Sequence, residues 1–131
     1  MGHMTHSAFP PRLFRACGAL VVACGVIMGA LTAHLPETAF ATGGRIMAHG
    51  AMEMQMWQGL ALVALGLGAE RFASRLMYLG TTGILLGTLL FCSAVYYTAF
   101  TGHHAGHVAP TGGSMLIVSW LCLAFAWARG A

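Results

Sequence analysis

A small set of histidine, glutamate and glutamine side chains could do chemistry in this sequence. His49 and Glu53 are four residues apart, so both lie on one face of a helix. His103, His104 and His107 are close enough in sequence to supply two or three imidazoles from one loop. Imidazole binds zinc and copper, and the methionine thioether suits copper(I). The candidate metal ligands are His34, His49, Glu53, His103, His104 and His107.

The same side chains also fit a structural role. Glu53 could pair with His49 or His34 at one end of a helical bundle, while Gln55 and Gln58 hydrogen-bond between helices. Two further alternatives stay open. One is a proton or small-solute pathway through Glu53, and the other is a haem between His34 and His49, which would need facing helices. We expect no resident cofactor unless copper or zinc binds.

The sequence contains no catalytic constellation. Ser93 and Ser119 have no nearby base in sequence, and Gly112-Gly113 lacks the lysine and the spacing of a phosphate-binding loop. The six basic residues are scattered arginines, and the formal net charge is only +3. Proteins that bind nucleic acid concentrate basic residues on one face. We therefore predict neither an enzyme nor a nucleic-acid-binding protein.

Long apolar segments must position these polar residues. The chain has 131 residues, of which 58% are hydrophobic and 7% charged, whereas soluble domains carry about 25% charged residues. Such a chain cannot cover a water-facing surface with polar groups, but a bilayer removes that need. We predict an all-α integral membrane protein. Its N-terminal tail covers residues 1–12, of which the first look like an expression remnant, so that Met4 could be the native start.

Four transmembrane helices are predicted within one domain of residues 13–128. The spans cover residues 13–35, 46–69, 75–100 and 112–128. Each approaches the length of about 20 residues that a bilayer requires. The short loops between them make neighbouring helices antiparallel, which predicts an up-down four-helix bundle.

The arginines predict the orientation of the bundle. If the N-terminus is inside, the inner segments carry Arg12, Arg15, Arg71, Arg75 and Arg129. The outer segments then carry only Arg45, and cytoplasmic loops are normally the richer in arginine. We therefore predict cytoplasmic termini in a bacterial inner membrane, with the polar cluster of His34, His49, Glu53, Gln55 and Gln58 at the outer end. An ionisable residue in a span usually faces the bundle interior, so we expect Glu53 to face inward.

Small residues recur on one stripe of each of the first three predicted helices. They include Gly25 and Gly29 on the first, Gly59 and Gly66 on the second, and Gly80, Gly83 and Gly87 on the third. Gly112, Gly113 and Trp120 are the predicted packing residues of the fourth helix. Small residues allow helix backbones to approach closely in lipid. The pattern leaves open whether the stripes join helices within one chain or between chains.

Four motifs in sequence order resemble a known family. They are Gly29-Ala30-Leu31-Thr32-Ala33-His34, Met54-Gln55-Met56-Trp57-Gln58-Gly59-Leu60-Ala61, Gly87-Thr88-Leu89-Leu90-Phe91-Cys92-Ser93-Ala94-Val95-Tyr96, and Ala109-Pro110-Thr111-Gly112-Gly113 with Trp120 after it. They resemble the YgdD-like small membrane proteins of unknown function (domain of unknown function 423), which are related to eukaryotic transmembrane protein 256. The resemblance covers about residues 13–127.

The resemblance implies a four-span inner-membrane bundle without an established enzyme activity. The positions that hold the family pattern are His34, Gln55, Tyr96, Pro110, Gly112, Gly113 and Trp120. Gln58 stands where the family usually has histidine, so a metal site that uses this histidine cannot be assumed here.

We predict a non-enzymatic accessory or packing subunit of a larger membrane complex. Its expected partners are the lipid bilayer and, through the glycine stripes, other membrane subunits or a second copy. The alternative is a protein that binds or handles copper or zinc at the periplasmic face.

Overall fold

The structure, a computed structural model, describes residues 10–69 and 74–130. These residues form α1 (Pro11–His34), the short 3₁₀ helix η1 (Glu37–Ala39), α2 (Gly44–Gly68), α3 (Arg75–Thr101) and α4 (Val108–Ala128). Arg71 and most of the predicted N-terminal tail, residues 1–9, lie outside the described residues. The four predicted helices are confirmed.

Local sequence signals explain where the helices begin and end. Pro11 occupies the first turn of α1, where its missing N–H group removes no helical hydrogen bond. The Ser74 side chain accepts a hydrogen bond from the Met77 backbone N–H and caps α3. At its other end, α3 stops at Gly102, whose φ of 74° is the left-handed conformation that glycine adopts without strain.

The fourth helix begins earlier than predicted. α4 starts at Val108, whereas the predicted span starts at Gly112, so His107 directly precedes α4 and Pro110 lies in its first turn. A proline is tolerated there because the first N–H groups of a helix have no partner within the helix. The predicted loop of residues 101–111 shortens accordingly.

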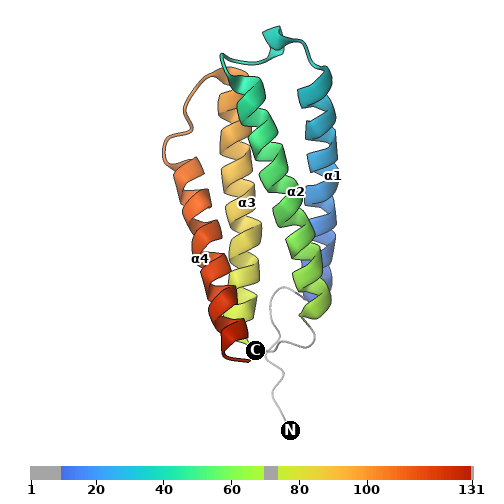
Figure 1. The fold of residues 1–131 in the computed structure, drawn as a ribbon, viewed down its shortest axis with the longest axis vertical. Helices are drawn as coiled ribbons and strands as arrows, with labels where there is room; N and C mark the ends of the chain where they lie inside the picture. The colour runs from blue at the N-terminus through green and yellow to red at the C-terminus, as the bar shows by residue number, and fades with distance from the viewer. Residues whose placement is uncertain (1–9, 70–73, 131) are drawn as a thin grey trace.

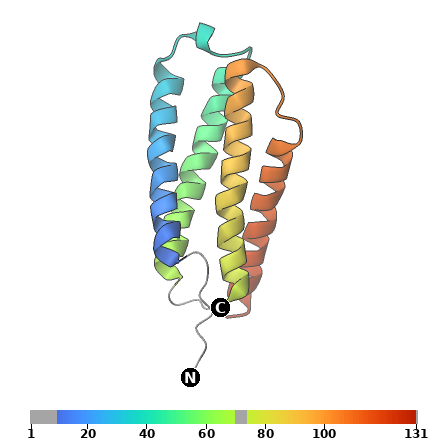
Figure 2. The ribbon, with the colours of Figure 1, turned by 180° about the vertical axis from the view of Figure 1, so that it is seen from behind.

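Consecutive helices run antiparallel, with α2 and α3 between α1 and α4 in both views (Figures 1 and 2). α1 packs mainly on α2, α4 packs on α3, and the α2–α3 contact joins the two pairs. The start of α1 and the end of α4 lie at the same end of the molecule (Figure 1). The buried core draws on all four helices, through Phe14, Leu62, Met77, Ile84, Leu116, Leu123 and Ala126.

The outer surface of the helices is largely apolar. Within the residues described, α1, α3 and α4 are long and apolar enough to cross a membrane. Large apolar side chains point outward from them: Leu20 and Ile117, for example, are each 65% exposed. A surface of this kind suits lipid rather than water. α2 is more polar, since it carries Arg45, His49, Glu53 and two glutamines.

The glycine stripes lie at helix contacts within the chain. A side-chain carbon added at Gly18 of α1 would lie 2.8 Å from the Gly59 backbone oxygen of α2. One added at Gly87 of α3 would lie 3.0 Å from the Gly112 backbone oxygen of α4. The stripes therefore bring α1 against α2 and α3 against α4, so that they join helices within the chain, one of the two alternatives that the pattern left open.

We predict that Gly112→Ala lowers the stability of the bundle by about 1–3 kcal/mol, the usual cost of overpacking. The new methyl group would lie 2.5 Å from the Phe91 backbone nitrogen, which cannot move independently of α3. Gly113→Ala is the matched control, because its methyl group would meet the Phe91 ring at an ordinary 3.7 Å. Thermal unfolding in detergent measures the difference, and equal melting temperatures for the two variants would contradict the prediction.

Candidate functional site

The ionisable residues of α2 point away from the bundle. His49 Nε2 and Glu53 Oε1 are 3.3 Å apart, and their side chains are 60% and 52% exposed. The expectation that Glu53 faces inward is therefore wrong. The physical reason is the rotation of α2. Gln55 and small residues such as Ala48 and Ala51 are buried against the neighbouring helices, which places Glu53 on the opposite side of α2.

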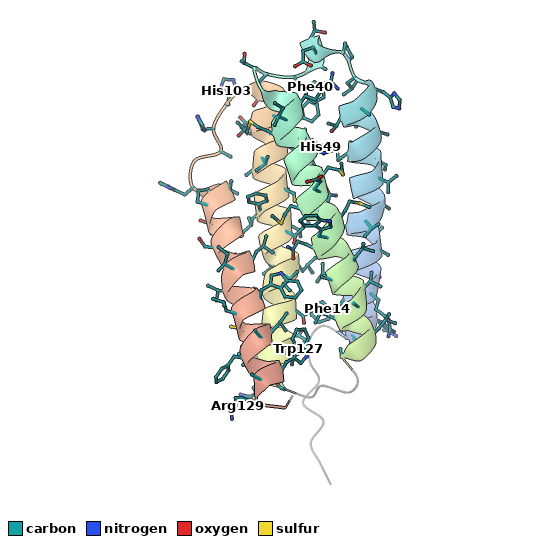
Figure 3. The ribbon with its side chains drawn as sticks, viewed as in Figure 1. Phe14, Phe40, His49, His103, Trp127 and Arg129 are labelled. Carbon is teal, nitrogen blue, oxygen red and sulfur yellow. The ribbon has the colours of Figure 1, made fainter. Side chains whose placement is uncertain are left out.

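The predicted metal ligands do not come together. His34 is the last residue of α1, His103 and His104 lie between α3 and α4, and His107 directly precedes α4. All of them are exposed, and Figure 3 shows His49 on α2 and His103 beyond the end of α3. Among the described residues, no three histidine, cysteine or acidic side chains gather closely enough to hold a metal ion. Of the six candidates, the structure pairs only His49 with Glu53.

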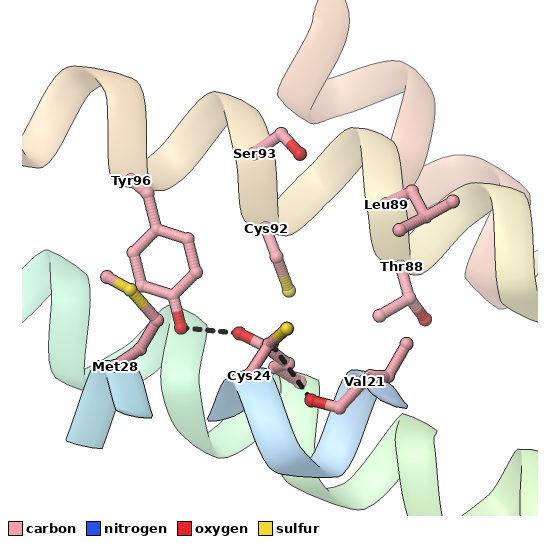
Figure 4. A pocket seen from close by; sticks show the side chains of 9 residues that line it. Val21, Cys24, Met28, Thr88, Leu89, Cys92, Ser93 and Tyr96 are labelled. Carbon is pink, nitrogen blue, oxygen red and sulfur yellow. Dashed lines mark hydrogen bonds between the residues drawn. The ribbon is translucent and has the colours of Figure 1, made fainter. Parts of the chain in front are cut away.

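Gln55 joins three helices inside the bundle. Its Nε2 donates a hydrogen bond to the Val21 backbone oxygen of α1 at 3.0 Å. The Tyr96 hydroxyl of α3 donates to Gln55 Oε1 at 2.7 Å, and Figure 4 marks both bonds with dashed lines. They border a pocket of about 210 Å³ that Cys24, Cys92 and other residues of α1 and α3 line. The predicted bridging role of Gln55 is confirmed.

Gln58 makes the corresponding link to α4. The Trp120 indole Nε1 donates to Gln58 Oε1 at 2.9 Å, and Gln58 Nε2 contacts the Met54 sulfur at 3.4 Å. These residues line a groove of about 490 Å³ between α2, α3 and α4. The bridge between helices that we expected of Gln58 is therefore also confirmed, with Trp120 as its partner.

Arg45 closes the end of the bundle where α1 stops and α2 begins, a role that charge counting alone did not reveal. Its guanidinium donates to Glu37 Oε2 at 2.9 Å, to the Leu35 backbone oxygen at 2.6 Å and to the Thr32 backbone oxygen. It also lies over the Phe40 ring, 4.6 Å from the centroid. Carbonyl groups at a helix C-terminus lack partners within the helix, and a cation there satisfies them. The sequence signal for this role was Pro36, which marks the end of α1, together with Glu37, an acidic partner for Arg45.

The site thus has a neutral interior and an ionisable exterior. The inner groups are amides, a phenol and an indole, which hydrogen-bond helices together. In the part of the chain that the structure describes, Glu53 is the one carboxylate within a long helix. The acid–imidazole chemistry available to α2 therefore lies on its outer face.

The family model for proteins of unknown function, DUF423, matches residues 28–113. The chain belongs to this DUF423 family. Two curated relatives are UPF0382 membrane proteins from Staphylococcus haemolyticus and Staphylococcus saprophyticus, each 29% identical over 113 residues, or 86% of this chain and 92% and 93% of theirs. One from Staphylococcus epidermidis is 28% identical over 116 residues, 88% of this chain and 94% of the relative. No solved structure matches significantly.

This DUF423 protein is a multi-pass membrane protein. Its relatives carry the name of membrane protein, and three of its helices have the length and composition of membrane spans. The structure also explains two motif positions of the resemblance. Gln55 and Tyr96 come from motifs far apart in sequence, and they are hydrogen-bonded to each other. Trp120, which follows the fourth motif, donates a hydrogen bond to Gln58 of the second motif.

We predict that Tyr96→Phe lowers stability by about 1 kcal/mol, the usual contribution of a hydrogen bond between membrane helices. The change removes the only donor that the structure places on Gln55 Oε1 among the described residues. Tyr97→Phe on the same helix is the control, because Tyr97 is 49% exposed. Thermal unfolding of both variants, alone and combined with Gln55→Leu, measures the coupling. Equal losses for Tyr96→Phe and Tyr97→Phe would refute this assignment.

Proposed function

We propose that this protein is a non-enzymatic subunit of a larger assembly in the bacterial inner membrane, with all four helices spanning it and both termini cytoplasmic.

The position and length of α2 support its role as the fourth span. α2 lies alongside its neighbours (Figures 1 and 2). At about 1.5 Å per residue it is about 37 Å long, enough to cross a hydrocarbon core of about 30 Å. Four described arginines support the orientation, since Arg12, Arg15, Arg75 and Arg129 belong to one end and Arg45 to the other.

The outward direction of the His49–Glu53 pair carries the proposal. At about 1.5 Å per residue, Glu53 lies about 13 Å along the axis from Gly44, about a third of the way along α2. A charged side chain costs about 3 kcal/mol at the centre of a span on insertion scales, and one within a span normally contacts protein or a water-filled cavity. Lipid offers neither contact, whereas a neighbouring subunit packed on α2 supplies one.

The other roles weighed for Glu53 receive no such support. Gln55 lines the pocket between α1 and α3, and Gln58 lines the groove beside α4. Glu53 lines neither of them, so neither offers a solute path past its carboxylate. Among the residues that the structure describes, the imidazole of His49 is the one candidate metal ligand beside Glu53. Both side chains are instead available to another protein on the outer face of α2.

We predict that the protein leaves native membranes in a mild detergent as a complex larger than its 13.7 kDa chain. Replacing both His49 and Glu53 by leucine removes the polar contact with the neighbour and releases the chain. The isolated chain then keeps or gains thermal stability, because leucine suits lipid better than an ionised side chain does. Native mass spectrometry of the extracted protein measures the mass.

Ser114→Leu provides the control for this experiment, since Ser114 is also an exposed polar residue, but on α4. The complex should survive this change. A wild-type chain that leaves native membranes alone, at the mass of its monomer, would overturn the proposal.

A further inference from the structure

The groove beside the Gln58–Trp120 hydrogen bond is open to the lipid. α2 and α4 each pack on α3 but make few backbone contacts with each other, and Phe91 of α3 also lines the groove. The volume of about 490 Å³ is in the usual range of about 300–1,000 Å³ for sites that bind small molecules. Two further lining residues, Ile117 and Leu121, are 65% and 64% exposed. A molecule dissolved in the bilayer can therefore enter from the side.

The groove offers one hydrogen-bond donor without a good acceptor. Its lining combines the rings of Phe91 and Trp120 with aliphatic side chains and the amide of Gln58. Gln58 Oε1 already accepts from the Trp120 indole. Gln58 Nε2 carries two N–H groups, and its one partner among the described residues is the Met54 sulfur at 3.4 Å, a weak acceptor. An oxygen atom within the groove would satisfy this nitrogen.

The depth of Gln58 restricts where such an oxygen comes from. At about 1.5 Å per residue, Gln58 lies about 21 Å along the axis from Gly44 and about 15 Å from Gly68, well inside the span. The ester oxygens of phospholipids lie at the edges of a hydrocarbon core about 30 Å thick, out of reach of this amide. An amide N–H without an acceptor is costly in hydrocarbon. The site therefore favours an acceptor that is carried by a molecule of the bilayer interior.

We infer that this groove binds the ring of a lipid-soluble quinone. A quinone presents carbonyl oxygens, which accept from Gln58 Nε2, on a flat ring, which packs with Phe91 and Trp120 as aromatic rings do. Its apolar chain leaves the groove past Ile117 and Leu121 into the lipid. A phospholipid acyl chain would fill the same space but offers no acceptor, and a water molecule would leave the aromatic rings uncovered. The inference rests on the proposed function in one respect, because the depth of Gln58 assumes that α2 is a membrane span.

Tryptophan fluorescence of the full chain in phosphatidylcholine nanodiscs tests the inference. Trp57→Phe and Trp127→Phe leave Trp120 as the one emitting indole, and neither replaced residue lines the groove. We expect decylubiquinone to quench Trp120 until a bound state saturates. Decylbenzene, which has the same chain on a ring without carbonyl groups, should not displace it. Quenching that rises linearly without saturation, or equal binding of decylbenzene, would contradict the inference.

A matched pair of leucine substitutions locates the binding site. Gly113→Leu fills the groove from α4, where an added side-chain carbon meets the Phe91 ring at 3.7 Å, and it leaves Gln58 and Trp120 in place. We expect the dissociation constant of decylubiquinone to rise about tenfold or more, which corresponds to about 1.4 kcal/mol. Gly50→Leu should leave the constant unchanged, because nothing lies within 4 Å of a side-chain carbon added there. Equal constants for the two variants would place the quinone elsewhere.

Infrared spectroscopy of the bound quinone tests the role of Gln58. A carbonyl group that accepts a hydrogen bond absorbs at a lower frequency than a free one. We expect the wild-type chain to lower the carbonyl stretching frequency of decylubiquinone, and Gln58→Leu to abolish this shift. An unshifted band in quinone bound to the wild-type chain would refute Gln58 as the donor.

The outcomes separate this inference from the proposed function. A chain that belongs to a larger complex in native membranes but binds no quinone overturns the inference alone. A chain that binds quinone but leaves native membranes as a monomer overturns the proposed function alone.

Discussion

The need to satisfy every polar group without water governs this bundle. In hydrocarbon, an unpaired amide or hydroxyl costs several kcal/mol, so the polar side chains of α2 must find partners on neighbouring helices. Gln55 finds them on α1 and α3, and Gln58 finds one on α4. Because one helix holds the other three in this way, the rotation of α2 determines what faces the interior and what faces outward.

The glycine contacts make these hydrogen bonds possible. Gly18 and Gly59 let the backbones of α1 and α2 approach closely, which brings the Val21 carbonyl within reach of Gln55. On the other side, Gly87 and Gly112 hold α4 against α3. Close packing and polar pairing thus support each other. Both are needed because lipid tails are as apolar as the side chains, so the hydrophobic effect does not drive helices together in a membrane.

The sequence predicted the number, order and approximate limits of the helices, because apolar length alone identifies a span. It also predicted that Gln55 and Gln58 join helices. It did not predict the direction of Glu53. Periodicity shows that His49 and Glu53 share a face, but in a membrane both faces of a helix are apolar, so hydrophobicity does not mark the inner one. Arg45 was missed for another reason, since its partners are backbone carbonyls that become available only where α1 ends.

Trp120 would accept as its partner at position 58 either glutamine or the histidine that the resemblance implies. The indole only donates a hydrogen bond, so its partner must present an acceptor at that position. The amide oxygen of Gln58 does so, and the unprotonated nitrogen of a neutral histidine can do the same. The change therefore keeps the link between α2 and α4 and keeps the interior neutral. The ionisable chemistry of α2 remains concentrated at His49 and Glu53, on the side of the helix that faces away from the bundle.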